Sequence, residues 1–157
     1  MTSPLLTVER AYNVPLERLW HAWTDASELE EWYSPAVLFV VPGTAVSELH
    51  EGGQWKIAVD VPENGFVAYF WGRYTAVEAP LFLEHTLHYS QNKADFDAAV
   101  ESADHHRIVL DFAERDGGSW VRLTQYGELP EEQIEATRLG TESYFDSLEL
   151  YIGREYY

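Results

Sequence analysis

The chain has 157 residues, the length of a single domain, and its 27 acidic residues against 10 basic ones give a formal net charge of −17. A field of this sign repels phosphate backbones and anionic lipids, so nucleic acid and membrane surfaces are not expected as partners. The lack of cysteine excludes disulfides and cysteine nucleophiles, and because no apolar run resembles a signal peptide or a membrane span, the expected location is the cytoplasm.

A strand and a helix are predicted at the start of the chain. Leu5 to Ala11 alternates in side-chain character, which is the period of a strand. Asn13 can then serve as the N-cap of a helix that has Pro15 in its first turn and runs to about Thr24.

A second short helix is predicted directly after the first. Asp25 and Glu28 have the spacing of a capping box, in which the Asp oxygen accepts a hydrogen bond from a first-turn N–H. This helix is expected to end near Trp32 and to be stopped by Pro35.

From Val37 to Tyr126 the helical period gives way to apolar runs separated by turn signals. Pairs such as Asn64-Gly65 supply the positive φ angles of tight hairpins, so an antiparallel meander is predicted. Gly72, inside the longest run, is the expected site of a β-bulge. The expected strands span residues 37–41, 45–50, 54–61, 66–78, 81–89, 106–113 and 119–126.

Two later segments complete the expected fold. Residues 92–104 do not fit the meander and are expected to form a short helix or a long loop. Pro130 and the acidic residues after it open a long final helix, whose apolar residues form one broad stripe. The predicted fold class is therefore α+β, with a curved antiparallel sheet wrapped around the C-terminal helix in one domain over residues 1–157.

Three segments carry a resemblance to a known family. They are RAYNVPLERLWHAWTDASELEEWYSP (residues 10–35), HEGGQWKI (50–57) with GRYTAVEAPLFLEHTLHY (72–89), and residues 121–151 with Thr124 and Gly140 in the family's positions. Together they cover nearly the whole chain. The chain resembles the heat-shock-protein ATPase activator-like family within the START and birch-pollen-allergen superfamily, also called SRPBCC.

The resemblance implies the helix-grip fold and a START-like cavity between the concave face of the sheet and the long helix. Across the superfamily this cavity holds lipids, sterols, polyketides or other apolar molecules, and the resemblance implies no reaction. Three departures would reshape the pocket: Thr141 stands where the family commonly has Trp, Ala76 stands where an acidic residue is usual, and residues 92–104 look inserted. Thr141 in particular should enlarge the pocket or admit water.

Aromatic residues make up 15% of the chain and are spread over every pocket-forming element. Such side chains can wall an apolar pocket, although core packing accounts for them equally well. The polar group expected to hold the ligand is Arg73 or His85. Arg73 must be paired with an opposite charge if it lies inside the cavity, and the competing interpretation of His85 is a core residue with satisfied hydrogen bonds. The candidate ligand-binding residues are Trp32, Trp55, Tyr69, Trp71, Arg73, His85, Thr141, Tyr144, Phe145 and Leu148.

The orientation of the strand at 66–78 stays open. Side chains alternate between the two faces of a sheet, so Trp71 and Arg73 share one face while Phe70 and Tyr74 share the other. Both sets are mainly apolar. The sequence therefore does not determine which set lines the cavity.

No metal, cofactor or catalytic residue is expected. His85 and His88 are three apart on one strand and should point to opposite faces, so they cannot chelate one metal together. His105 and His106 lie near acidic residues and are interpreted as part of a solvated loop. Motifs of serine nucleophiles, zinc helices, phosphate loops and dinucleotide sites are absent from the sequence.

Three functions are compatible with these observations. The leading hypothesis is a non-enzymatic domain that binds a small hydrophobic or amphipathic ligand. One alternative is a small cyclase, aromatase or hydrolase that uses His85 as a general base. Another is a co-chaperone-like protein-interaction module, and both a homodimer and a protein partner are left open.

Overall fold

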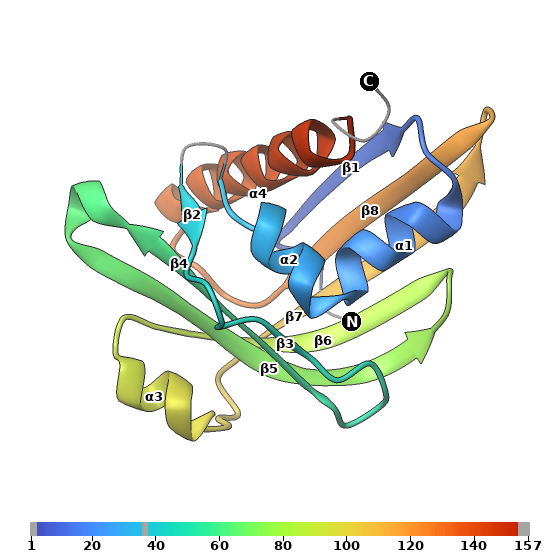
Figure 1. Cartoon of the computed structure of the whole chain (residues 1–157). Coiled ribbons are helices and arrows are strands. Elements are labelled where there is room, and N and C mark those ends of the chain that lie inside the picture. The colour runs from blue at the N-terminus through green and yellow to red at the C-terminus, as the bar shows by residue number, and fades with distance from the viewer. Residues whose placement is uncertain (1–2, 36–37, 154–157) are drawn as a thin grey trace.

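The fold comes from a computed structural model that describes residues 3–35 and 38–153. It confirms the predicted α+β architecture: a curled antiparallel sheet, two short helices after the first strand, and a long helix against the sheet (Figure 1). The elements are β1 (Leu6–Tyr12), α1 (Leu16–Thr24), α2 (Ala26–Trp32), β2 (Phe39–Val40), β3 (Val46–Ser47), β4 (Gln54–Val61), the 3₁₀ helix Pro62–Asn64, β5 (Phe66–Glu78), β6 (Phe82–Ser90), α3 (Lys93–Ala98), β7 (His106–Arg115), β8 (Gly118–Tyr126) and α4 (Glu131–Gly153).

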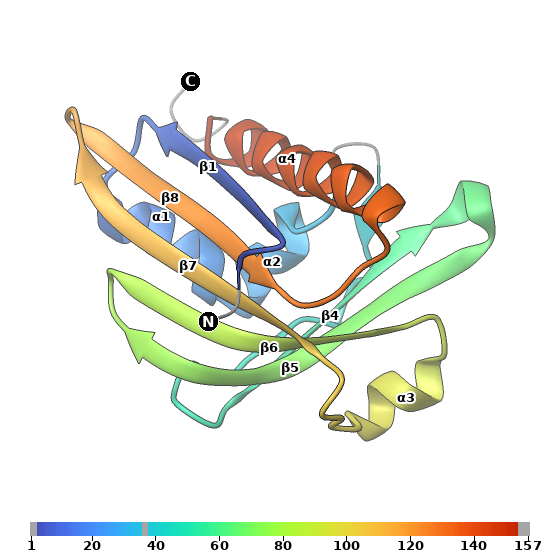
Figure 2. The same cartoon turned by 180° about the vertical axis from the view of Figure 1, so that it is seen from behind.

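The sheet has the strand order β1-β8-β7-β6-β5-β4-β2, and β3 pairs with β4 as well. Figures 1 and 2 show α4 running beside β1, with α1 and α2 inside the curl and α3 outside it, against β5 and β6. None of the helices in the described ranges combines the length and the apolar character that crossing a bilayer demands.

The starts of the two short helices differ in how they are capped. Asp25 caps α2 as predicted, because its carboxylate accepts a hydrogen bond from the Glu28 N–H at 3.2 Å. The expected cap of α1 was wrong: α1 begins after Pro15, whose carbonyl accepts from Leu19 N–H, and no side chain caps it. The fixed φ of proline presets the first turn without help from Asn13.

Within the meander, the two shortest strands are smaller than expected. The segment predicted at 45–50 pairs only at Val46–Ser47, and the one at 37–41 only at Phe39–Val40, with Val37 outside the described residues. The predicted bulge at Gly72 was also wrong, because the register between β5 and β6 shifts between Tyr74 and Ala76.

The segment at 92–104 contains the short helix α3, which packs on the convex face of the sheet. The Asn92 side chain caps α3 by accepting from Ala94 N–H at 2.9 Å, and Phe96 joins Ala58 and Trp71 in a small separate cluster. Pairing of β6 with β7 ends at Leu87 and His106, although β6 continues to pair with β5. The excursion through α3 therefore opens the sheet between β6 and β7.

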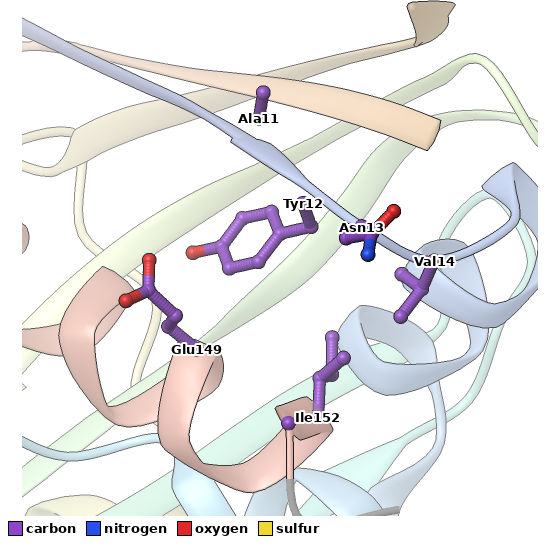
Figure 3. A pocket seen from close by; sticks show the side chains of 7 residues that line it. Ala11, Tyr12, Asn13, Val14, Glu149 and Ile152 are labelled. Atoms are coloured by element: carbon purple, nitrogen blue, oxygen red, sulfur yellow. The ribbon is translucent and has the colours of Figure 1, made fainter. Parts of the chain in front are cut away.

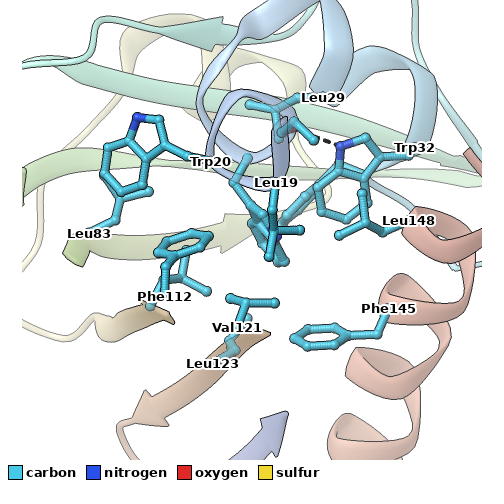
Figure 4. Packing of buried hydrophobic residues seen from close by; sticks show 14 of the residues in the cluster. Leu19, Trp20, Leu29, Trp32, Leu83, Phe112, Val121, Leu123, Phe145 and Leu148 are labelled. Carbon is cyan, nitrogen blue, oxygen red and sulfur yellow. Dashed lines mark hydrogen bonds between the residues drawn. The ribbon is translucent and has the colours of Figure 1, made fainter. Parts of the chain in front are cut away.

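The main core fills the curl between α1, α2, α4 and the sheet. Figure 4 shows Leu19, Trp32 and Phe145 converging there from three helices, opposite Phe112 and Val121 of the sheet. The rings meet edge to face, as aromatic quadrupoles favour, with ring centroids 4.7 Å apart for Trp23 and Trp32 and 5.7 Å apart for Trp23 and Phe145. This half of the space under α4 is solid.

Candidate functional site

A cavity of about 280 Å³ remains between the concave face of the sheet and the N-terminal half of α4. We call it the inner cavity. Most of its wall is apolar, and polar atoms come from a few side chains, which is the usual composition of a small-molecule site. Its wall includes Tyr33, Phe70, Leu87, Ile108, Gln125 and Thr141.

The helix wall of the inner cavity owes its space to small residues. Gly140 has no side chain, and a Cβ added there would have no atom within 4 Å. Thr141 is buried and donates its hydroxyl to the Thr137 carbonyl at 3.0 Å, so its polar group is satisfied along the helix. Tyr144 stacks on Tyr33 with centroids 4.9 Å apart, and burial raises the pKa of both phenols, which therefore stay neutral. The cavity is thus uncharged at the helix.

Only two of the ten candidate residues, Thr141 and Tyr144, line the inner cavity. Five others belong to the solid core beside it: Trp32, Trp55, His85, Phe145 and Leu148. The side chains of these five residues pack in the core and are not among the residues that line the inner cavity. Trp32, for example, donates its indole N–H to the Ala22 carbonyl at 2.9 Å and is 2% exposed.

The remaining three candidates, Tyr69, Trp71 and Arg73, lie on the convex face and do not line the inner cavity, although Trp71 lines a larger cavity next to it. Trp71 donates its indole N–H to the Val100 carbonyl at 2.8 Å. Arg73 is ion-paired with Glu101 at 2.9 Å, so it is a surface group that holds the loop after α3. The alternate set of β5, with Phe70 and Tyr74, packs against the main core.

His85 is a core residue. Its ring stacks on Trp55 with centroids 4.2 Å apart, and its Nδ1 lies 2.8 Å from the Thr86 carbonyl oxygen. It is 2% exposed, and loss of hydration lowers its pKa to about 4. A histidine in this position is neutral at pH 7 and out of reach of a molecule in the inner cavity.

Replacing His85 by Phe should remove part of the acid sensitivity of the fold. The unfolded histidine has a pKa of about 6.5, above the folded value of about 4, so the unfolded chain binds more protons between these values and stability falls as pH drops through this window. From pH 7 to pH 4.5, the wild type should lose about 2 kcal/mol more unfolding free energy than His85→Phe. Urea denaturation at both pH values measures this, and equal losses would contradict it.

A second cavity of about 670 Å³ adjoins the inner cavity where β6 and β7 separate. We call it the vestibule. It lies between the end of β6, the loop after α3 and the start of α4, and shares Phe70, Leu87, Gln125 and Thr137 with the inner cavity. None of these four was a candidate from the sequence. Gln125 could have been found, because it follows Val121 and Leu123 on the inward face of β8 at a period of two.

Three imidazoles lie in the wall of the vestibule. His106 has its Nδ1 2.7 Å from the Gln125 amide nitrogen and its Nε2 3.2 Å from the Glu128 carbonyl oxygen. His88 accepts a hydrogen bond at Nε2 from Ser102 N–H, at 3.0 Å, and its ring contacts His105. The pair His105 and His106, interpreted from the sequence as a solvated loop, therefore lines a cavity.

Two other places bring together groups that could hold a ligand. Among the described residues, His21, Asp25 and Glu28 bring three ligand atoms within 4.8 Å of one another, but Arg18 forms an ion pair with Glu28 at 2.7 Å and supplies positive charge there already. Figure 3 shows a surface pocket of about 410 Å³ between the ends of β1 and α4, lined by Tyr12, Asn13, Val14, Glu149 and Ile152. It adjoins Gly153, where the description of the chain ends.

Comparison with known proteins agrees with this architecture. The sequence profile of the family described as "Activator of Hsp90 ATPase homolog 1-like protein" matches residues 13–153. No curated protein matches the chain.

Similar solved structures come from several bacteria. The AHSA1 protein of Silicibacter pomeroyi has a TM-score of 0.79 at 18% identity, covering 96% of this chain and 98% of that one. A Staphylococcus epidermidis protein has a TM-score of 0.76 at 21% identity, with 96% and 90% covered. A Rhodobacter sphaeroides protein has 0.75 at 22%, with 95% and 92% covered. At these identities the likeness shows the fold alone.

Proposed function

The chain belongs to the Activator of Hsp90 ATPase homolog 1-like family, and on that basis we propose that it binds a small apolar or amphipathic ligand in the inner cavity. The observation that carries the proposal is a contrast in side-chain packing between two parts of the protein interior. Beside a core in which large aromatic side chains close all space, the N-terminal half of α4 leaves about 280 Å³ open above an apolar wall. An apolar molecule there would gain the burial that the missing side chains do not supply.

The two other hypotheses have less support. The enzyme alternative relied on His85 as a general base, but His85 is packed against Trp55 and does not line the cavity. The interaction-module alternative relied on the family name and on acidic charge, and the 27 acidic residues are spread along the whole sequence. The inner cavity supports ligand binding over these two alternatives.

Thr141→Trp should abolish binding of a neutral apolar probe. The indole replaces a small side chain in the helix wall and occupies the inner cavity, where the neighbouring Gly140 leaves room for it. N-phenyl-1-naphthylamine, which fluoresces when it leaves water, is the probe. The wild type should show saturable enhancement, and Thr141→Trp should show at least about a tenfold weaker response, since the probe loses its burial.

Leu139→Trp is the matched control. It adds the same indole to the same helix, but Leu139 is 55% exposed and does not line the inner cavity. This variant should bind the probe like the wild type. Saturable binding that survives Thr141→Trp, or that is lost equally in both variants, would contradict the proposed location.

A further inference from the structure

The inner cavity is one compartment of a longer binding site. Four residues, Phe70, Leu87, Gln125 and Thr137, line both it and the vestibule, so the two spaces meet where β6 and β7 part. A molecule with its apolar part against α4 therefore has a polar end that reaches the vestibule. The chemistry of that wall selects the end group.

Carboxylates dominate the charge of the vestibule. Its described wall contains Asp95, Asp104 and Glu128 and no Lys or Arg. The neighbouring cations have partners elsewhere, since Lys93 pairs with Asp97 at 2.8 Å and Arg107 with Glu84 at 3.0 Å. The chain as a whole carries a formal charge of −17. This field attracts a cation and repels a carboxylate or phosphate.

The imidazoles of the vestibule are hydrogen-bonded within the protein. The Nε2 of His88 accepts a hydrogen bond from the Ser102 N–H at 3.0 Å. His106 contacts the Gln125 amide through Nδ1 and the Glu128 carbonyl through Nε2. His105 has its Nδ1 2.6 Å from the Ser102 carbonyl oxygen, where its N–H is the donor.

A hydrogen-bond acceptor lies at the junction of the two compartments. Gln125 is 7% exposed and lines both compartments, and while its amide nitrogen contacts His106, its Oε1 accepts no hydrogen bond from the described part of the chain. Because this oxygen is not sealed off from solvent, a donor group on a bound molecule can reach it. Phe70 and Tyr89, whose ring centroids lie 5.3 Å apart, also line the vestibule, and a cation is attracted to aromatic ring faces.

We infer that the ligand is an amphiphile with a protonated amine as its head, held in the vestibule by Gln125 and the carboxylates, and with an apolar body in the inner cavity. This inference rests on the proposed function. An amine supplies both N–H donors for the Gln125 Oε1 and the positive charge that Asp95, Asp104 and Glu128 attract.

The preference for the head group can be tested with three compounds that have similar ten-carbon chains: decylamine, decanol and decanoate. Each is titrated at pH 7 and low salt into the full chain loaded with N-phenyl-1-naphthylamine, and displacement of the probe gives its affinity. Decylamine should bind about fivefold tighter than decanol, the gain expected of a partly solvated charge pair, and decanoate should bind most weakly.

Charge removal in the vestibule isolates the head-group effect. The triple variant Asp95→Asn, Asp104→Asn, Glu128→Gln keeps shape and polarity, so decanol should bind as before while the advantage of decylamine disappears. Asp97→Asn is the matched control, because Asp97 lies on the same helix, pairs with Lys93 and is outside the vestibule wall. Asp97→Asn should still bind decylamine tighter than decanol.

The outcomes separate this inference from the proposed function. The amine head is wrong if decanoate and decylamine bind the wild type with equal affinity, or if decylamine still binds tighter than decanol in the triple variant. In either case, decanol binding that Thr141→Trp blocks would still support the inner cavity. If neither the probe nor decanol binds, the proposed function itself fails.

Discussion

Phe145→Ala is expected to lower the free energy of unfolding by about 4 kcal/mol, within the range for removing a buried phenylalanine. The Phe145 ring is 0% exposed, meets Trp23 edge to face, and lies 5.8 Å from the Arg10 guanidinium, measured to the ring centroid. Its removal leaves a void where α4 sits in the sheet, and the rigid aromatic neighbours cannot collapse into it. Urea denaturation followed by tryptophan fluorescence and by circular dichroism measures the change.

Leu150→Ala is the control for the same helix. Leu150 is 66% exposed, so its truncation should change the free energy of unfolding by less than about 0.5 kcal/mol. A comparable loss in the two variants would mean that α4 is not anchored through its buried face. Such a result would also remove the basis for placing a cavity beneath it.

Gly72→Ala should be the most damaging of the small substitutions. A Cβ at this position would lie 1.9 Å from the Thr86 carbonyl oxygen and 2.8 Å from its hydroxyl oxygen, which are distances that real Cβ atoms do not adopt. Both contacts come from the adjacent strand β6, so β5 and β6 must separate locally. We expect a loss of about 3 kcal/mol or more in unfolding free energy.

Gly140→Ala is the control for that prediction. Gly140 lies inside α4 and faces open space, so alanine there should raise the free energy of unfolding by about 0.5 to 1 kcal/mol through helix propensity. Thermal denaturation of both variants checks the opposite signs. Two destabilised variants, or two neutral ones, would refute the close approach of Gly72 to β6.

The fold was predictable because its determinants are local in the sequence. The Asp25 capping box set the start of α2, glycine-containing turns set the hairpins, and Pro130 with its acidic neighbours marked the start of α4. Apart from the N-cap of α1, the errors concern strands, whose extent and register depend on their pairing partners. The geometry of the neighbouring strand decides how far a short strand extends and where β5 shifts register against β6. Gly72 shows in addition that a glycine within a strand can mark a close approach of the backbone to the next strand instead of a bulge.

The candidate site was less predictable from the sequence because it depends on two properties that are not local: which face of β5 lines the cavity, and how completely side chains fill the space under α4. Both faces of β5 are apolar, since one packs on the core while the other receives Phe96 of α3, so the sequence does not show that Trp71 faces away from the inner cavity. Packing then decided how much of the space under α4 was filled: Phe145 closes it and Thr141 leaves it open. Gln125 carried a detectable signal, because it is a polar residue on the inward face of a strand.

The parting of β6 and β7 also makes the protein suitable as a fluorescent sensor. The loop after α3 borders the vestibule, and Val100 within it is 52% exposed while only its backbone oxygen is engaged, by Trp71. Because the chain has no cysteine, Val100→Cys would introduce a single thiol for a polarity-sensitive dye. A dye at this position of the vestibule would report the arrival of a molecule while leaving the wall of the inner cavity unmodified.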